Sequence, residues 1–140
     1  MNEPERGAKY PREQGSVSIF IAVLALSFLM VAGLAVDGGR KLGALSDARD
    51  LADNAARAGA QAVDTNTYRS TGVPALDPAA ATQAAARYLA ASGHTGEVTV
   101  TAATVTVTVR LQVQTRFLPG PYNVSATQTA TAVLGVEGPQ

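Results

Sequence analysis

The spacing of apolar residues changes along the chain, and each change predicts a different structural element. Residues Val17–Val36 form an unbroken run without a charged side chain. As a helix, this run of twenty residues would be about 30 Å long, which matches the hydrocarbon core of a bilayer. A buried core helix seldom lacks a polar face over such a length, so the run predicts a membrane span.

The pattern remains helical beyond the span as far as Asp64, and no proline follows until Pro74. Small residues recur along this segment in two sets, each at steps of three or four that place its members on one helix face. The small residues expected to pack are Ala48, Ala52, Ala55 and Gly59 in the stem, and Ala35, Gly39 and Gly43 where the helix leaves the membrane. Because small side chains let backbones approach closely, we expect the helix to pack against other helices or against the protein's own domain. The alternative is that a general excess of alanine produces the pattern.

Capping signals follow the stem. Thr65–Asp77 has neither a helical nor a strand period, and it is rich in turn residues, so we predict a loop. Asp77 suits the N-cap of a helix, and Pro78 suits its first position. We expect that helix to cover residues 78–91 and to end at Gly93, since glycine is the usual residue beyond a helix end.

After Gly96, apolar residues alternate with polar ones, which is the period of half-buried strands. Valine alternates mainly with threonine over residues 98–101 and 104–114, and the alternation resumes over 123–136. Ala102-Ala103 is expected to form a turn, or to lie within one bent strand. The pattern predicts a small antiparallel sheet of about three strands, with one threonine-rich face and one face covered by helix.

These elements predict an α+β protein with a long N-terminal helix, a second short helix and the antiparallel sheet. We expect a cytoplasmic leader at 1–16, a transmembrane helix at 17–36, an alanine-rich stem helix at 37–64 and a small extracytoplasmic α+β domain at 65–140. Lysine and arginine are equally frequent on the two sides of the span, so they do not set its orientation. The lack of cysteine, the abundance of threonine and the N-terminal position of the span favour a single-pass protein of the cell membrane whose C-terminal domain is extracytoplasmic.

A cleaved secretory signal is the alternative to a membrane anchor. Gly33 and Ala35 are small residues at the two positions that signal peptidase reads before Val36. However, the apolar run is longer than the usual core of a signal peptide, and the helical pattern continues past it without a turn. We therefore favour a retained anchor.

Composition excludes several classes of function. Eleven lysines and arginines balance eleven aspartates and glutamates, so there is no basic excess with which to bind nucleic acid. With no cysteine and a single histidine, His94, the chain has no disulfide framework, cysteine nucleophile or multi-histidine metal site. Asp47, Asp50 and Asn54 share a helix face that we interpret as solvated, and spacing links no acid or serine to His94. We expect no catalysis, no metal and no cofactor.

Residues Gly15–Asp64 resemble the N-terminal region of TadE/TadG-like proteins, minor-pilin-like components of the tight-adherence (Tad/Flp) pilus machinery. The resemblance lies in the order of parts: a charged leader ending in Gly15-Ser16, the uncharged span, Asp37-Gly38-Gly39-Arg40 at the membrane exit, and an alanine-rich helix. The threonine–valine strands and the Phe117–Gly120 break are similar to the small domains of actinobacterial members. The resemblance implies a pilin-like fold, in which half of a long helix lies in the membrane and half packs on a sheet.

The resemblance also implies a function without catalysis, as a minor pilin or pseudopilin-like subunit in the assembly of a Tad/Flp-type pilus or a related secretion apparatus. The implied partners are the lipid bilayer, other pilus subunits bound through the N-terminal helix, and a prepilin peptidase that cuts between Gly15 and Ser16. Phe20 stands where such prepilins usually carry glutamate, which favours a subunit that stays in the membrane, or caps or primes a fibre, over a bulk pilin. The alternative is an anchored or secreted adhesin or binding module that uses the threonine-rich sheet face.

Overall fold

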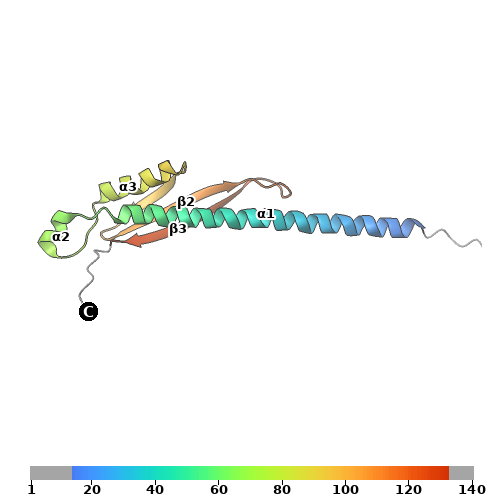
Figure 1. Ribbon diagram of the computed structural model, residues 1–140, viewed down its shortest axis with the longest axis horizontal. Helices are drawn as coiled ribbons and strands as arrows, with labels where there is room; N and C mark the ends of the chain where they lie inside the picture. Colours follow the sequence, from blue (N-terminus) through green and yellow to red (C-terminus); the bar gives the residue numbers. More distant parts are fainter. Residues whose placement is uncertain (1–13, 133–140) are drawn as a thin grey trace, which may run out of the picture.

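The computed structural model describes residues 14–132 (Figure 1). In chain order, the elements are helices α1 (Gln14–Ala60), α2 (Thr65–Thr71) and α3 (Pro78–Ala91), followed by strands β1 (Gly96–Val100), β2 (Thr104–Val113) and β3 (Tyr122–Thr131). The fold is α+β, as the sequence predicts. Positions 1–13 of the predicted leader and positions 133–136 of the predicted third strand lie outside the described residues.

Helix α1 joins the predicted span and the predicted stem into one helix of 47 residues, about 70 Å long at the standard rise. It begins at Gln14, so the last residues of the predicted leader are helical. Its N-terminal half extends beyond the sheet (Figure 1), and the large apolar side chains of that half are exposed. Among the described helices, α1 alone is long and apolar enough to cross a membrane.

The stem ends at Ala60 rather than at Asp64, because the chain reverses direction there. The backbone N–H of Asp64 donates to the carbonyl of Ala75 at 2.8 Å, and Val63 forms an isolated antiparallel bridge with Leu76. These pairings bring the two ends of the segment 64–75 together beside the core.

The loop predicted at Thr65–Asp77 is wrong for its first half, which forms α2. The carboxylate of Asp64 accepts hydrogen bonds from the backbone N–H groups of Asn66 and Thr67, at 2.9 and 3.2 Å, and from the Thr67 hydroxyl at 2.6 Å. This cap compensates for a sequence of threonine and serine with low helix propensity. The Thr67 hydroxyl and the two N–H groups also lower the pKa of Asp64, against a smaller opposing effect of burial.

Helix α3 has the predicted bounds and the predicted cap. The carboxylate of Asp77 accepts from the backbone N–H groups of Ala79 and Ala80, at 2.9 and 3.1 Å. Beyond the other end, Gly93 has a φ of +75°, a left-handed conformation that glycine adopts without steric cost. Leu89 is buried on the inner face of the helix.

The sheet has the order β1-β2-β3, and both pairings are antiparallel. Ala102-Ala103 turns the chain between β1 and β2, so the bent-strand alternative is wrong. Neither alanine has a positive φ, so this is not one of the glycine-dependent hairpin turns. Instead, neighbouring segments use both carbonyls: that of Ala102 accepts from the N–H of Leu76 at 2.9 Å, and that of Ala103 accepts from the N–H of Ala132 at 2.8 Å.

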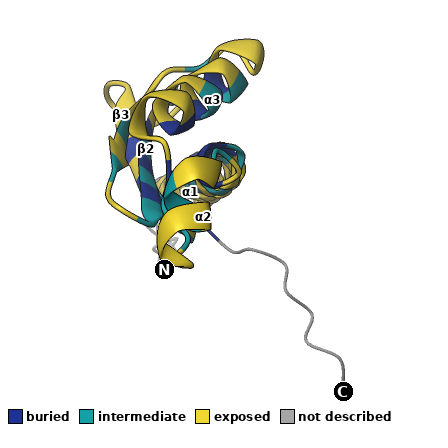
Figure 2. Ribbon diagram, turned by 90° about the vertical axis from the view of Figure 1, so that its left-hand side faces the viewer, coloured by how far each residue is buried: buried dark blue, intermediate teal, exposed yellow. Residues whose placement is uncertain are grey.

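Helices α1 and α3 lie side by side on one face of the sheet (Figure 2). Valines 105, 107 and 109 of β2 point into this layer and are fully buried, as are alanines 48, 52, 55 and 56 of α1. The opposite face carries threonine pairs across β2 and β3. The hydroxyls of Thr106 and Thr129 lie 3.0 Å apart, and those of Thr108 and Thr127 lie 2.8 Å apart. The predicted division into an apolar face and a threonine-rich face is confirmed.

We expect Ala52→Leu to destabilise the folded domain, because the added side chain has no space between α1 and the sheet. Overpacking of a core costs about 1–3 kcal/mol in the free energy of unfolding. Chemical denaturation of the full chain in detergent, followed by near-ultraviolet circular dichroism, measures the change. Asp50→Lys, at an exposed position of the same helix, is the control and should have little effect. Equal stability of the two variants would contradict the packing described here.

Candidate functional site

A single carboxylate ties α1 to the β2–β3 loop, residues 114–121. Asp37 lies one residue beyond the predicted span, and its side chain is only 2% exposed. It accepts hydrogen bonds from three consecutive backbone N–H groups, those of Arg116, Phe117 and Leu118, at 3.1, 2.9 and 2.9 Å. We call this arrangement the Asp37 clamp.

The clamp is electrostatically consistent with an ionised carboxylate. The N–H of Arg116 makes the largest contribution to lowering the pKa of Asp37, and the N–H groups of Phe117 and Leu118 and the charge of Arg40 lower it further. Burial acts in the opposite direction, since it disfavours the charged form, but the pKa remains below its ordinary value. Asp37 is therefore negatively charged at neutral pH.

Other contacts shape the loop around the clamp. The Thr115 hydroxyl lies within hydrogen-bond distance of the carbonyls of Leu118 and Gly120, and Gly120 has a φ of +82°. At the start of β3, the ring of Tyr122 lies 5.5 Å from the ammonium group of Lys41, within the range of a cation–π contact. The loop is thus held by its own turn and by two residues of α1.

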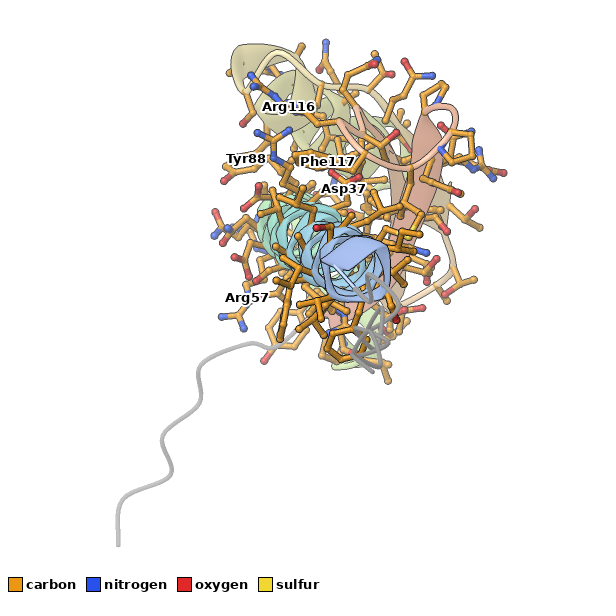
Figure 3. All side chains as sticks on the ribbon, turned by 90° about the vertical axis from the view of Figure 1, so that its right-hand side faces the viewer. Asp37, Arg57, Tyr88, Arg116 and Phe117 are labelled. Atoms are coloured by element: carbon orange, nitrogen blue, oxygen red, sulfur yellow. The ribbon has the colours of Figure 1, made fainter. Side chains whose placement is uncertain are left out.

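Phe117 lies directly against α1 at Gly33. A Cβ atom at Gly33 would be 2.9 Å from Cγ of Phe117, so the ring occupies the space that any larger residue would need. Figure 3 looks along α1 and shows Asp37, Arg116 and Phe117 on one side of the helix, with Arg57 pointing away from them. Leu29, Met30, Gly33 and Leu34 of α1 line an apolar groove together with Phe117 and Leu118.

The residues of the motif Asp37-Gly38-Gly39-Arg40 lie in different environments. Asp37 is buried in the clamp, Gly38 is half-buried, and Gly39 and Arg40 are exposed. Sequence analysis singled out the motif but missed the contact of Asp37 with residues 116–118, which lie 79 to 81 positions away in the chain. The available signals were an aspartate directly after an apolar run and the interruption of the strand pattern at Phe117–Gly120.

The two predicted sets of small residues lie in different environments. Ala48, Ala52, Ala55 and Gly59 are buried in the protein's own core, where a Cβ at Gly59 would lie 3.0 Å from the carbonyl oxygen of Ala81. The remaining members, Ala35, Gly39 and Gly43, are exposed on the surface of α1. A Cβ at Gly39 or Gly43 would meet no atom within 4 Å. We call these three residues the free small-residue row.

The other candidate positions show no catalytic arrangement. Gly15 and Ser16 lie in the first turn of α1. Asp47, Asp50, Asn54 and His94 line a common open groove, and the Nδ1 of His94 lies 2.7 Å from the carbonyl oxygen of Ser92. Among residues 14–132, no group of three potential metal-binding side chains lies close enough to hold an ion.

Comparison with known families supports the resemblance seen in the sequence. Residues 15–62 match the model of the Tad family, described as Flp pilus-assembly TadE/G-like. The match covers α1 from its second residue to its end, including the apolar run, Asp37 and the alanine-rich stem. No match was found among curated proteins or among solved structures.

We expect Asp37→Asn to release the β2–β3 loop. Both oxygens of the carboxylate accept hydrogen bonds from the loop, whereas an amide has one oxygen to accept with and an NH2 group that cannot accept from the backbone N–H groups. Backbone amides of residues 116–118 should then exchange with solvent several-fold faster in hydrogen-exchange measurements at neutral pH. Asp50→Asn, an exposed carboxylate of the same helix, should leave those amides protected. Unchanged protection in Asp37→Asn would contradict the clamp.

The same carboxylate predicts a pH dependence. Because the pKa of Asp37 is lower in the folded protein than its ordinary value of 3.8, its contribution to stability is complete above that value and disappears as the pH falls through the folded pKa. The difference in unfolding free energy between the wild-type protein and Asp37→Asn should therefore be largest near neutral pH. It should shrink below pH 3.8. A difference that grows on acidification would have the wrong sign.

Proposed function

We propose that this protein is a membrane-anchored minor subunit, pilin-like or pseudopilin-like, that takes part without catalysis in the assembly of a Tad/Flp-type pilus or a related secretion apparatus. The match of residues 15–62 to the TadE/G-like family is the observation that carries this proposal. It coincides with one element, α1, and includes both the part of that helix that packs on the sheet and the part that does not.

The surface of α1 supports membrane anchoring. Over Val17–Val36, nearly every side chain is exposed and apolar, which is costly in water but favourable in hydrocarbon. A cleaved signal has the same composition, so the continuity of α1 through Asp37 into the folded domain is the argument for an anchor. Cleavage before Val36 would remove Gly33, the residue on which Phe117 packs.

The free small-residue row is the proposed contact with other subunits. Glycine within a helix costs about 1 kcal/mol relative to alanine, and neither Gly39 nor Gly43 has a neighbour in the chain that requires the small size. A close approach by a second helix would explain both residues, because helices pack at short distance where small residues recur every four positions. Ala35, the first residue of the row, lies within the proposed span and contacts lipid. The proposed helix partners are other pilus subunits.

Processing by a prepilin peptidase is part of the same proposal. The implied cleavage lies between Gly15 and Ser16, which places the start of a mature chain at the start of α1. Phe20 in place of the usual glutamate separates this chain from bulk pilins, since no carboxylate is then present near the mature N-terminus to pair with a neighbour. We therefore place the subunit in the membrane, or at a fibre end, rather than along the fibre.

We expect the protein to remain in the membrane fraction after carbonate extraction, because the span is retained. Protease added to spheroplasts should digest the domain that follows the span, while a cytoplasmic marker protein should be spared. Release by carbonate, with a mature N-terminus near Val36, would favour a secreted protein. Full protection of the domain would refute the proposed orientation.

Gly39→Leu is expected to weaken assembly without destabilising the fold, since its side chain would extend into space that is open in the monomer. In-cell cross-linking to neighbouring subunits and piliation should both decrease, while the denaturation midpoint should not fall, since leucine favours the helix more than glycine does. Ala52→Leu provides the contrast, because it should lower the midpoint by disturbing the core, and Asp50→Lys should be silent in both assays. Normal cross-linking and piliation in Gly39→Leu would contradict the proposed contact.

A further inference from the structure

The β2–β3 loop carries an unusual concentration of exposed apolar side chains. Outside α1, the described residues expose four large apolar side chains: Val73, Phe117, Leu118 and Tyr122. The last three lie in or next to this loop, and the Phe117 side chain is 67% exposed. The loop therefore presents an apolar tip at the end of the domain that adjoins the apolar half of α1 (Figure 1).

The apolar tip is held in place rather than left free. The Asp37 clamp binds the backbone of residues 116–118, and the Thr115 hydroxyl contacts two carbonyls of the same turn. A clamp on backbone atoms fixes the loop while leaving the Phe117 and Leu118 side chains outside the core. The fold thus uses a buried carboxylate to maintain an exposed apolar surface, which is the expected arrangement where that surface meets an apolar environment.

The position of Phe117 along α1 places the tip at the depth of a membrane interface. Its ring packs on Gly33, which lies three residues before Val36, the last residue of the span. At the helical rise this corresponds to about 5 Å below the end of the span. Aromatic side chains concentrate at this level of membrane proteins, where the hydrocarbon meets the headgroups.

Three basic residues adjoin the tip. Arg40 and Lys41 follow the clamp on α1, and Arg116 precedes Phe117 in the loop, and all three are exposed. Basic side chains at this level can reach lipid phosphates while their neighbours contact acyl chains. Below them, the groove lined by Leu29, Met30, Gly33, Leu34, Phe117 and Leu118 is apolar and continuous with the lipid-facing surface of the helix.

We propose that the tip of the β2–β3 loop, Phe117 and Leu118, inserts into the leaflet facing the domain, with phospholipid acyl chains filling the groove between the loop and α1. This inference rests on the proposed function, because it requires α1 to span the membrane. The domain is then attached to the bilayer at two places, the span and the loop. Asp37 is the positioning residue that sets the depth of the second attachment.

The chain contains no tryptophan, so Phe117→Trp creates a protein with a single tryptophan. The test uses the full chain in nanodiscs that hold one copy each. The discs are made from phosphatidylcholine and phosphatidylglycerol, and in one set these lipids are brominated near the top of the acyl chain. We expect a loss of fluorescence with the brominated lipids and a blue-shifted emission. Thr127→Trp, on the threonine-rich face, is the matched control and should show neither effect.

Phe28→Trp, in the middle of the span, separates failure of this inference from failure of the proposed function. Its discs hold lipids brominated near the end of the acyl chain, because residue 28 lies about 12 Å below the end of the span. If Phe28→Trp is quenched by the brominated lipids and Phe117→Trp is not, the loop does not insert, whereas the anchor stands. If Phe28→Trp is not quenched either, the membrane anchor itself is wrong and the inference falls with it. The remaining outcome is a blue shift of Phe117→Trp only in discs with two copies, without quenching in single-copy discs. It would show that a second copy of the chain, and not lipid, covers the tip of the loop, and would overturn the proposal.

The role of Asp37 is tested in the same system. Adding Asp37→Asn to Phe117→Trp should reduce quenching by the brominated lipids, because the loop is no longer held at its depth, whereas adding Asp50→Asn should not. Quenching of Phe28→Trp should be the same with either change, since both residues lie outside the span. Full quenching of Phe117→Trp in the presence of Asp37→Asn would overturn the positioning role.

Discussion

Methyl-sized side chains on one face of α1 lie against the valines of β2, and this contact sets how closely the long helix approaches the sheet. Ala48, Ala52 and Ala55 have no exposed surface, and Gly59 leaves room for a backbone carbonyl of α3 at its side. Larger residues at these positions would separate the two layers and expose the valine face. The small-residue pattern of the stem is therefore first of all a requirement of the protein's own core.

The Asp37 clamp extends this attachment past the sheet toward the apolar half of α1. Three backbone N–H groups that have no strand partner at the end of β2 are satisfied by one buried carboxylate, so the loop can leave the ladder without unpaired donors. The position of the loop relative to α1 is consequently fixed by a charge-assisted contact rather than by apolar packing alone. In the proposed function, this contact holds the β2–β3 loop of the domain at the level of the membrane surface.

Local signals in the sequence account well for α3 and the strands. Asp77-Pro78 marks the start of α3 and Gly93 marks its end. Alternation of valine with threonine indicates a half-buried strand. They account less well for α2, because threonine and serine give no helical period and the helix depends on the Asp64 cap. They also place the stem's end four residues too late, since Ala60–Asp64 has suitable composition and only pairing with Ala75 and Leu76 reverses the chain.

The sequence by itself determined the long helix, the change to strands and the polarity of the two sheet faces, because each depends on residue spacing within a short segment. Only the tertiary structure decided which small residues are available to a partner. Ala52 faces the sheet and is buried, whereas Gly39 lies on the exposed side of α1, although its neighbours Gly38 and Lys41 line a groove with Val113 and Tyr122 of the sheet. It also decided that Asp37 is buried, because the N–H groups it binds come from residues 116–118, and no spacing rule connects segments so distant in the chain.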